Sequence, residues 1–388
     1  MILTSGQSHA LQLFCSGENL LLLGDPGTGK STLISVIVQQ AEKSGKRVAK
    51  TASTGIAAQL IGGRTVHSLL QAYPGVKDEK IDYEKKARNL DDVDVLIIDE
   101  ISMLGRFFIQ YLYNCLNHAE HHVQLILSGD FFQLPPVKDE YAFLSPYWNL
   151  LNLVPCVLTE VIRQNDKEFI RNINLLKYGN DQCIEYLLSH SNPTALTGQI
   201  SICATKKDAD LINHAELQKL AGEPYIYLAE YEGVISESDL QVEERMILKP
   251  GMRVMSVING TSYRNGSLGT VVSLDQFYVE VLFDNNWKVC FGRRNFTVDR
   301  MDIPGKTTEL WQIPIRPAYA ITIHKSQGQT FQYVNIDGTR CWAPGQLYVA
   351  VSRARSIEGI HFLTPIRQCN IKTDPAVIRF YEGLYSKY

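Results

Sequence analysis

The segment Gly24 to Ser31, GDPGTGKS, combines residue types that bind phosphate. Gly24, four further residues and then Gly29-Lys30-Ser31 match the P-loop pattern. In that pattern, backbone N–H groups at a helix N-terminus hold phosphates, the lysine reaches the β and γ phosphates, and the serine hydroxyl ligates magnesium. The sequence therefore predicts a site for ATP and Mg²⁺. The residues of this segment predicted to bind the nucleotide are Gly24, Asp25, Pro26, Gly27, Thr28, Gly29, Lys30, Ser31 and Thr32.

An acidic pair follows a second apolar run. Residues Val93 to Ile98 read as a buried strand that ends in Asp99-Glu100. Ligands bind at the carboxyl edge of parallel strands, so Asp99 is predicted to hold magnesium with Ser31, and Glu100 to polarise the attacking water. An isolated acidic pair in this position is as often a helix cap. Beside a P-loop, the catalytic interpretation is favoured.

A third strand, in VQLILSGDFFQLPPV, ends in polar residues at the same predicted edge. Gln133 is a candidate to sense the γ-phosphate and orient water. A rigid turn closed by Pro135 and Pro136 is compatible with that role, because it would hold the glutamine still.

The elements that position these residues are a strand at Asn19 to Leu23 and a helix from Ser31 to about Ser44, ended by Gly45. With the two later strands they predict a parallel, RecA-like nucleotide-binding core over residues 1–160.

A second series of α/β signals begins with ISICATKKDADLINHAEL, a strand followed by an amphipathic helix. Its predicted inward positions are Ala209, Ile212, Ala215 and Leu217. The alternation continues to the C-terminus without a second P-loop pattern. We therefore predict a second RecA-like core over residues 161–240 and 306–388.

Three arginines of the second series, Arg163, Arg353 and Arg355, lie near predicted element ends. A lone arginine is usually a surface residue. Arg353, in YVAVSRAR, directly follows an apolar element, which favours an arginine finger that stabilises charge on the γ-phosphate.

Residues 241–305 change to short alternating strands with Asn-Gly turns at 259 and 265. They predict a small antiparallel β-barrel inserted in the second core. The full prediction is an α/β fold with two RecA-like parallel-sheet cores in tandem and this inserted barrel. Its aromatic residues suit either stacking on nucleic-acid bases or a barrel core, and Phe277 and Trp287 are predicted in the core.

Composition bounds the class of protein. The 388 residues are 45% hydrophobic and 20% charged, with a net charge of −3, typical of a globular protein and without a global signal for nucleic acid. The early residues lack a signal-peptide pattern and a membrane-length apolar run, so an intracellular, cytoplasmic location without membrane partners is expected. The eight cysteines form no C-x-x-C pair, so neither a zinc site nor disulfides are predicted, and core positions are expected.

The stretch Ile321 to Thr330, ITIHKSQGQT, leaves three interpretations open. It is a polar loop that ends a strand, a solvated helix cap, or a segment that binds an anion.

Taken as a set, these motifs resemble the superfamily 1 DNA helicases of 5′-to-3′ polarity, closest to the Pif-type helicases and related to RecD and phage Dda helicases. LTSGQSHAL is similar to the family's Q motif, which places Gln7 on the adenine. TASTGIAAQLIGGRTVHSLL is similar to its strand-gripping segment, although a helix N-cap at Ser53 or Thr54 and a packed alanine pair also fit it. LTEVIRQND matches the motif that carries Arg163, and AITIHKSQGQTF the motif between nucleotide and nucleic acid. The resemblance implies that Gln327 and Gly328 face the nucleotide, and that nucleic acid is bound by Thr54, His67, Pro135, Arg264, His324 and Lys325.

The resemblance further implies an ATP-dependent helicase in DNA replication, recombination or repair, acting on single-stranded DNA and on forked or tailed duplexes. The family's duplex-splitting wedge would be a short insertion at residues 72–90, with Tyr73 or Tyr83 at its tip. Both walls of the ATP site come from one chain, so a monomer is expected, and the sequence leaves the protein partners unknown. The rivals are an RNA-directed helicase or a non-unwinding translocase, a binding protein without turnover, and a small-substrate P-loop kinase.

Overall fold

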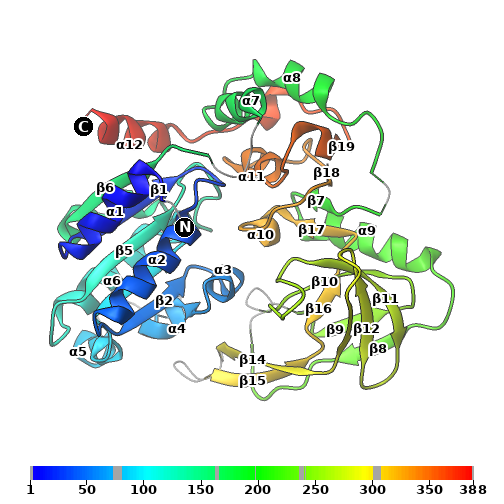
Figure 1. Ribbon diagram of the computed structural model, residues 1–388, viewed down its shortest axis with the longest axis horizontal. Coiled ribbons are helices and arrows are strands. Elements are labelled where there is room, and N and C mark those ends of the chain that lie inside the picture. Colours follow the sequence, from blue (N-terminus) through cyan, green and yellow to red (C-terminus); the bar gives the residue numbers. More distant parts are fainter. Residues whose placement is uncertain are drawn as a thin grey trace. The chain divides into compact units, whose positions relative to one another are not determined.

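The computed structural model describes residues 3–72, 81–161, 166–196, 198–235, 240, 242–299 and 307–386. The chain forms two compact units. The first comprises Met1–Cys183, Ala343–Ser352 and Ile371–Tyr388, and the second comprises Ile184–Trp342 and Arg353–Asn370. Residues 166–183, 343–352 and 371–386, which the predicted boundaries place in the second core, thus pack with the first unit. The first unit includes both α1 (Ser5–Cys15), at the blue end of the chain in Figure 1, and α12 (Pro375–Tyr385), at the red end.

Most of the first unit alternates between strands and helices. Its remaining elements are β1 (Asn19–Gly24), α2 (Lys30–Lys43), β2 (Val48–Ala52), α3 (Gly55–Leu60), β3 (Arg64–Thr65), α4 (Val66–Leu70), α5 (Tyr83–Ala87), β4 (Val95–Asp99), α6 (Arg106–Asn117), β5 (Gln124–Gly129), β6 (Leu153–Leu158), α7 (Lys167–Lys177) and α11 (Gln346–Ser352).

The six strands of the first unit form one parallel sheet in the order β3-β2-β4-β5-β1-β6. Leu20 to Leu23 are at most 1% exposed, as expected for a strand with both faces covered. Leu33 and Ile37 of α2 and Phe14 of α1 belong to the hydrophobic cluster on this sheet. The central order β4-β5-β1 brings together, at one edge of the sheet, the ends of the three strands that carry the predicted catalytic residues.

The second unit contains two kinds of sheet. Its elements are α8 (Cys183–His190, beginning at the last residue of the first unit), β7 (Ser201–Cys203), α9 (Lys206–Lys219), β8 (Tyr225–Leu228), β9 (Arg245–Leu248), β10 (Arg253–Ser256), β11 (Leu268–Leu274), β12 (Val279–Phe283), β13 (Lys288–Phe291), β14 (Arg294–Asp299), β15 (Thr307–Gln312), β16 (Ile315–Pro317), β17 (Ala320–Thr322), α10 (Ile323–Ser326), β18 (Val334–Ile336) and β19 (Ile360–Phe362).

The parallel sheet of the second unit has the order β17-β7-β18-β19. Two α/β units with parallel sheets therefore confirm the predicted fold class at that level. Helix α9 buries Ala209 and Leu217 and packs Ile212 partly against β7 and β17. The predicted inward position Ala215 is wrong, because this residue is exposed.

The antiparallel strands form a five-stranded sheet, β13-β12-β11-β10-β16, and the two-stranded sheets β14-β15 and β8-β9. Each sheet is open among the described residues, so closure into a barrel is not confirmed. The core of the large sheet contains Val254, Val281, Phe283 and Phe291, with the Tyr263 ring 4.9 Å from that of Phe283.

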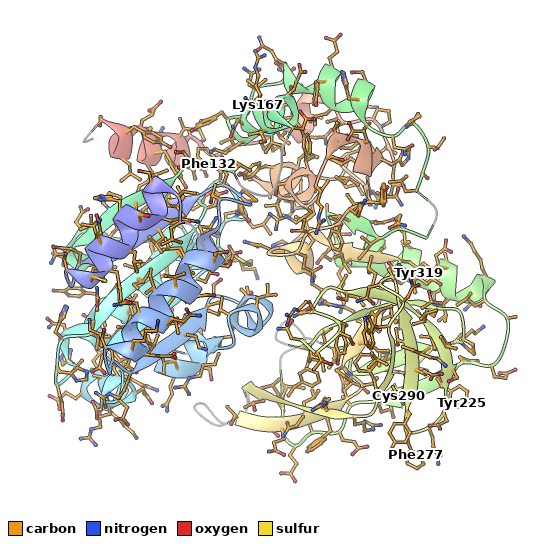
Figure 2. All side chains as sticks on the ribbon, in the orientation of Figure 1. Phe132, Lys167, Tyr225, Phe277, Cys290 and Tyr319 are labelled. Carbon is orange, nitrogen blue, oxygen red and sulfur yellow. The ribbon has the colours of Figure 1, made fainter. Side chains whose placement is uncertain are left out.

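The prediction that Phe277 and Trp287 lie in this core is wrong. Phe277 is 62% exposed and Trp287 59% exposed. Both residues lie in turns: the Phe277 N–H donates to Asp275 Oδ1 at 2.7 Å, and Trp287 follows Asn286, which has a φ of 66°. A turn directs these side chains away from the alternating inward positions of the strands. Figure 2 shows Phe277 at the edge of the unit.

The cysteine prediction holds for five of the eight residues. Five cysteines are buried and three are exposed. The buried ones are Cys115, Cys156, Cys183, Cys203 and Cys341, and the exposed ones are Cys15, Cys290 and Cys369.

Nowhere in the described ranges does a helix have both the length and the apolar character needed to cross a membrane.

Candidate ATP site and nucleic-acid interface

The P-loop connects β1 to α2 in a conformation that requires glycine. Gly27 and Gly29 have φ angles of 89° and 81°, in the left-handed region that glycine adopts without strain. A Cβ on Gly24 would lie 2.6 Å from Thr28 Oγ1 and 2.8 Å from the Leu158 carbonyl oxygen. The loop therefore curls tightly over the end of β1.

Lys30 is the first residue of α2, and its side chain turns back into this loop. Its Nζ donates to the carbonyl oxygens of Gly24 at 2.5 Å and Asp25 at 3.2 Å. Ser31 and Thr32 are exposed in the first turn of the helix, where the backbone N–H groups lack intrahelical partners.

Gln7 contacts the P-loop backbone. It is 2% exposed, and its Nε2 donates to the carbonyl oxygens of Thr28 at 3.3 Å and Gly29 at 3.4 Å. Its Oε1 accepts from the Thr4 N–H at 3.0 Å and completes the capping box of α1. The side chain thus lies beside the phosphate loop, and its role in reading adenine stays a prediction.

Asp99 and Glu100 occupy the end of β4. Asp99 is 8% exposed, and its Oδ1 accepts from the Glu100 N–H at 3.0 Å. Burial raises the pKa of Asp99, while that N–H and the Lys30 charge act in the opposite direction. Glu100 has a φ of 54°, which is strained for a residue other than glycine and is typical of functional sites. Gly129, at the end of β5, leaves room for this turn, since a Cβ there would lie 2.9 Å from Ile101 Cγ2.

Gln133 follows β5 and is 4% exposed. Its Nε2 donates to Asp130 Oδ2 at 3.2 Å, and its backbone N–H donates to the Asp130 carbonyl at 3.0 Å. Its Oε1 is buried and has no hydrogen-bond partner among the described residues. A buried acceptor in this state is unusual, and a water or ligand at the site would satisfy it. Pro135, predicted to contact nucleic acid, is half-buried two residues further on.

A charged cluster beside the P-loop is not among the sequence predictions. Lys177, in the last turn of α7, places Nζ 2.6 Å from Asp25 Oδ1. The Tyr348 hydroxyl, on α11, donates to Asp130 Oδ2 at 3.0 Å and lies 3.5 Å from Asp25 Oδ1. Burial lowers the pKa of Lys177, but the charges of Asp25 and Asp130 outweigh it and raise the value. Tyr348 lies within the YVAVSRAR segment, which is the one sequence signal that points to it.

The residues at this edge fit ATP with magnesium. A bound Mg²⁺-triphosphate needs groups that hold its phosphates and groups that ligate its metal. The phosphate-binding groups are the glycine loop, where a Cβ on Gly24 would have no room, and the Lys30 ammonium. The metal-binding groups are the Ser31 hydroxyl and the buried Asp99 carboxylate. The unpartnered Gln133 Oε1 adds an acceptor for water.

Of the three arginines near predicted element ends, the structure describes Arg353 and Arg355. Arg163 lies outside the described residues. Arg353 follows α11 directly, is 2% exposed and donates from Nη1 to the Gln329 carbonyl oxygen at 3.4 Å. Arg355 is exposed.

The predicted strand-gripping segment is a capped helix. Thr54 Oγ1 accepts from the Ala57 N–H at 3.2 Å at the start of α3, and Ala57 and Ala58 are buried. The helix-cap interpretation is therefore confirmed, and the nucleic-acid contact of Thr54 stays a prediction. Burial lowers the pKa of His67 to about 4, and its ring lies 4.7 Å from that of Phe108.

The stretch Ile321 to Thr330 ends β17 and forms the short helix α10. Thr322 Oγ1 caps it by accepting from the Lys325 N–H at 3.3 Å, so the stretch does contain a helix cap. The predicted solvation of that cap is not confirmed, because Ile323 and Ser326 are buried. His324 is exposed, while burial and the neighbouring Arg316 charge lower the pKa of the half-buried Lys325. Gln327 is 6% exposed and Gly328 has a φ of 76°. Binding of an anion by this stretch stays a prediction.

Two further predicted contacts lie on turns or short elements. Arg264 is exposed, and its backbone N–H donates to Ser267 Oγ at 2.9 Å. Residues 73–80 of the predicted wedge insertion, including Tyr73, lie outside the described residues. Tyr83 packs 5.5 Å from Tyr111 in α6.

The fold and the site define a P-loop ATPase of the helicase type. The first parallel sheet carries a P-loop, an acidic strand end and a glutamine at one edge, and a second unit with a parallel sheet follows it in the chain. A family profile described as an AAA domain matches residues 2–195, and one described as a UvrD-like helicase C-terminal domain matches residues 317–356. The chain belongs to the Pif1 family of ATP-dependent DNA helicases, since it is 32% identical to the Pif1 helicase of Bdellovibrio bacteriovorus over 98% of this chain and 93% of that protein.

Other relatives agree with this assignment. The chain is 31% identical to the PIF1 helicase of Xenopus laevis, of which it spans 64%. It is similar to the crystal structure of Pif1 helicase from Candida albicans, with a TM-score of 0.83 and 29% identity over 99% of this chain and 100% of that one. It is also similar to Bacteroides Pif1 in complex with ADP-AlF4, with a TM-score of 0.80 and 30% identity over 100% of this chain and 98% of that one.

Proposed function

We propose that the protein is an ATP-dependent DNA helicase that moves 5′ to 3′ along single-stranded DNA and separates duplexes ahead of it. The observation that carries the proposal is the convergence of Lys30, Asp99 and Gln133 on one sheet edge, in a chain that matches Pif1 helicases over nearly its whole length. A Bacteroides Pif1 has been crystallised with single-stranded DNA, which supports the same substrate here.

In the ATPase step, Lys30 and the N-terminus of α2 would bind the phosphates, while Ser31 and Asp99 would hold a Mg²⁺ ion. The metal would offset the charge of the triphosphate. Glu100 accepts the proton of the attacking water, and the unpartnered Gln133 Oε1 orients that water. Arg163 and Arg353 stabilise the transferring phosphoryl group, and Gln7, Gln327 and Gly328 complete the nucleotide site.

On the nucleic-acid side, Thr54, His67, Pro135, Arg264, His324 and Lys325 contact the strand. Most of the affinity comes from phosphate contacts, so binding is salt-dependent and weakly dependent on sequence. The five-stranded antiparallel sheet corresponds to the family's Src-homology-like barrel subdomain. The protein acts as an intracellular monomer in DNA replication, recombination or repair. If its source is a bacterium or a phage, the protein is associated with the bacterial nucleoid.

A strand-separation assay tests this proposal. Duplexes with a 5′ tail, a 3′ tail or no tail are incubated with protein, ATP and Mg²⁺, and release of the labelled strand is followed. The expected result is release from the 5′-tailed duplex only. Release from the 3′-tailed duplex alone would overturn the polarity, and hydrolysis without release from any duplex would favour a translocase.

The second candidate is an RNA-directed helicase built on the same motor. Hydrolysis stimulated by DNA and RNA strands of one sequence distinguishes the two, with stronger stimulation by DNA expected.

A further inference from the structure

A buried polar cluster links the P-loop to two helices that are distant in sequence. Its members are Asp25 of the P-loop, Asp130 after β5, Lys177 of α7 and Tyr348 of α11, all in the first unit. Asp130 is 1% exposed, Tyr348 2% and Lys177 8%. Lys177 also places its ammonium 4.9 Å from the centroid of the Phe132 ring, which is labelled in Figure 2. Burying an unpaired charge lowers the stability of a fold, so a buried group of charged and polar side chains is unusual unless its members pair with one another or serve a function.

Asp130 connects the cluster to the predicted water-orienting residue. Its Oδ1 accepts from the Phe132 N–H at 3.0 Å. Its Oδ2 accepts from both the Tyr348 hydroxyl at 3.0 Å and the Gln133 Nε2 at 3.2 Å. Because the Gln133 amide nitrogen is held in this way, its Oε1 is the atom left as an acceptor. The orientation of the Gln133 amide thus depends on where the Asp130 carboxylate is fixed.

The helix that carries Tyr348 contacts the same loop through its backbone. Gly345, immediately before α11, has a φ of 76°, and a Cβ there would lie 2.5 Å from the Phe132 carbonyl oxygen. At its other end α11 leads directly into Arg353. We call the loop from Asp130 to Gln133 the sensor loop. Helix α11 therefore contacts the sensor loop at one end and is followed at its other end by Arg353, the predicted arginine finger.

Lys177 supplies the charge that lets two carboxylates share this space. Asp25 and Asp130 repel each other, and the Tyr348 hydroxyl lies within 3.5 Å of both. The Lys177 ammonium pairs with Asp25 and attracts Asp130 through space. Thr373 Oγ1 donates to the Lys177 carbonyl oxygen at 2.7 Å and so ties this end of α7 to the chain before α12.

We propose that Tyr348 is a positioning residue of the ATPase: its hydroxyl fixes Asp130 so that Gln133 presents Oε1 to the attacking water, and Lys177 balances the charge of the cluster. This inference rests on the proposed ATPase function and adds residues that the motifs do not assign. Tyr348 acts through Gln133, so its removal should slow turnover without weakening ATP binding.

The test is Tyr348→Phe, which removes the hydroxyl and keeps the ring. We expect a fall in kcat of about tenfold, as for loss of a hydrogen bond to a charged group, with the KM for ATP changed less than threefold. The matched control is Tyr381→Phe. Tyr381 is 4% exposed, its ring lies 4.7 Å from that of Phe132, and its hydroxyl accepts from the Phe131 N–H at 3.3 Å, but it makes no hydrogen bond to Asp130 or Gln133. We expect kcat of the control within twofold of the unsubstituted protein.

A double-mutant cycle with Gln133→Ala separates positioning from general stability. If Tyr348 acts through Gln133, then Tyr348→Phe causes no further loss of kcat once Gln133 is alanine. Losses that multiply, or an unchanged kcat in Tyr348→Phe, would overturn the inference. If Tyr348→Phe does not fold, Asp130→Asn in the same cycle replaces it, with the same expected non-additivity.

The unsubstituted protein distinguishes this inference from the function on which it rests. If it shows no DNA-stimulated hydrolysis, both proposals fall. If it hydrolyses ATP and Tyr348→Phe is silent, only the positioning role is lost.

Discussion

Gly345 approaches Gln133 so closely that a Cβ on Gly345 would lie 2.4 Å from the Gln133 carbonyl oxygen. Gly345 also has a φ of 76°, which alanine adopts only with strain. We therefore expect Gly345→Ala to lower the free energy of unfolding by about 1–3 kcal/mol and to reduce kcat by displacing the sensor loop. Denaturant unfolding and steady-state ATPase assays measure the two effects.

Gly383 provides a matched control for this substitution. It lies within α12, and apart from its two chain neighbours and the helix's own backbone, no heavy atom of the described residues lies within 4 Å of the position its Cβ would take. Gly383→Ala should raise stability by about 0.5–1 kcal/mol through helix propensity and leave hydrolysis unchanged. Equal effects of the two substitutions would argue against a specific contact between Gly345 and the sensor loop.

Lys30→Ala removes the ammonium that lies within the P-loop. Without that charge the β and γ phosphates lose their main side-chain contact, so ATP hydrolysis should disappear. The predicted nucleic-acid residues remain, so single-strand binding should persist. Hydrolysis is measured by phosphate release, and binding by fluorescence anisotropy of a labelled strand. Near-normal hydrolysis by this variant would refute the assignment of the ATP site.

The sequence predicted the local geometry of this site well, because β1, the P-loop and α2 are contiguous and their burial pattern is strong. The predicted strand at Asn19 to Leu23 and the helix starting at Ser31 are each within one residue of the observed elements. The Lys177–Asp25 and Tyr348–Asp130 contacts join residues 152 and 218 positions apart. No short-range pattern encodes such pairs, since they depend on how α7 and α11 return to the first unit.

The error at Phe277 and Trp287 has a related cause. Aromatic residues in a segment of alternating strands are usually inward, but Asp275 and Asn286 create turns that place these two outside the alternation. The prediction of burial rested on residue type alone, whereas the geometry of the two turns leaves both side chains exposed.

Arg353→Ala tests the arginine finger. If Arg353 stabilises charge on the γ-phosphate, kcat should fall by about 10³ to 10⁵. Arg353→Lys should also be slow, because lysine keeps the charge but lacks the planar fork of donors. Since Arg353 is 2% exposed and bonded to Gln329, thermal melting must accompany the kinetics to show that each variant is folded. A change of less than tenfold in folded Arg353→Ala would assign the residue a structural role.

His67 has a pKa near 4, so it is neutral at pH 7 in the folded protein. An unfolded histidine, with a pKa near 6.5, takes up a proton as the pH falls, and the folded protein therefore loses stability between pH 6.5 and 4, by at most about 3 kcal/mol. His67→Gln should flatten this part of the stability profile, measured by urea unfolding at a series of pH values.

His67 is also predicted to contact the nucleic acid. A neutral side chain releases no counterion, so His67→Gln should weaken strand binding without changing its salt dependence. Lys325→Ala is the contrasting variant and should reduce the salt slope by about one unit. An equal reduction of the slope in His67→Gln would mean that His67 binds the strand as a cation.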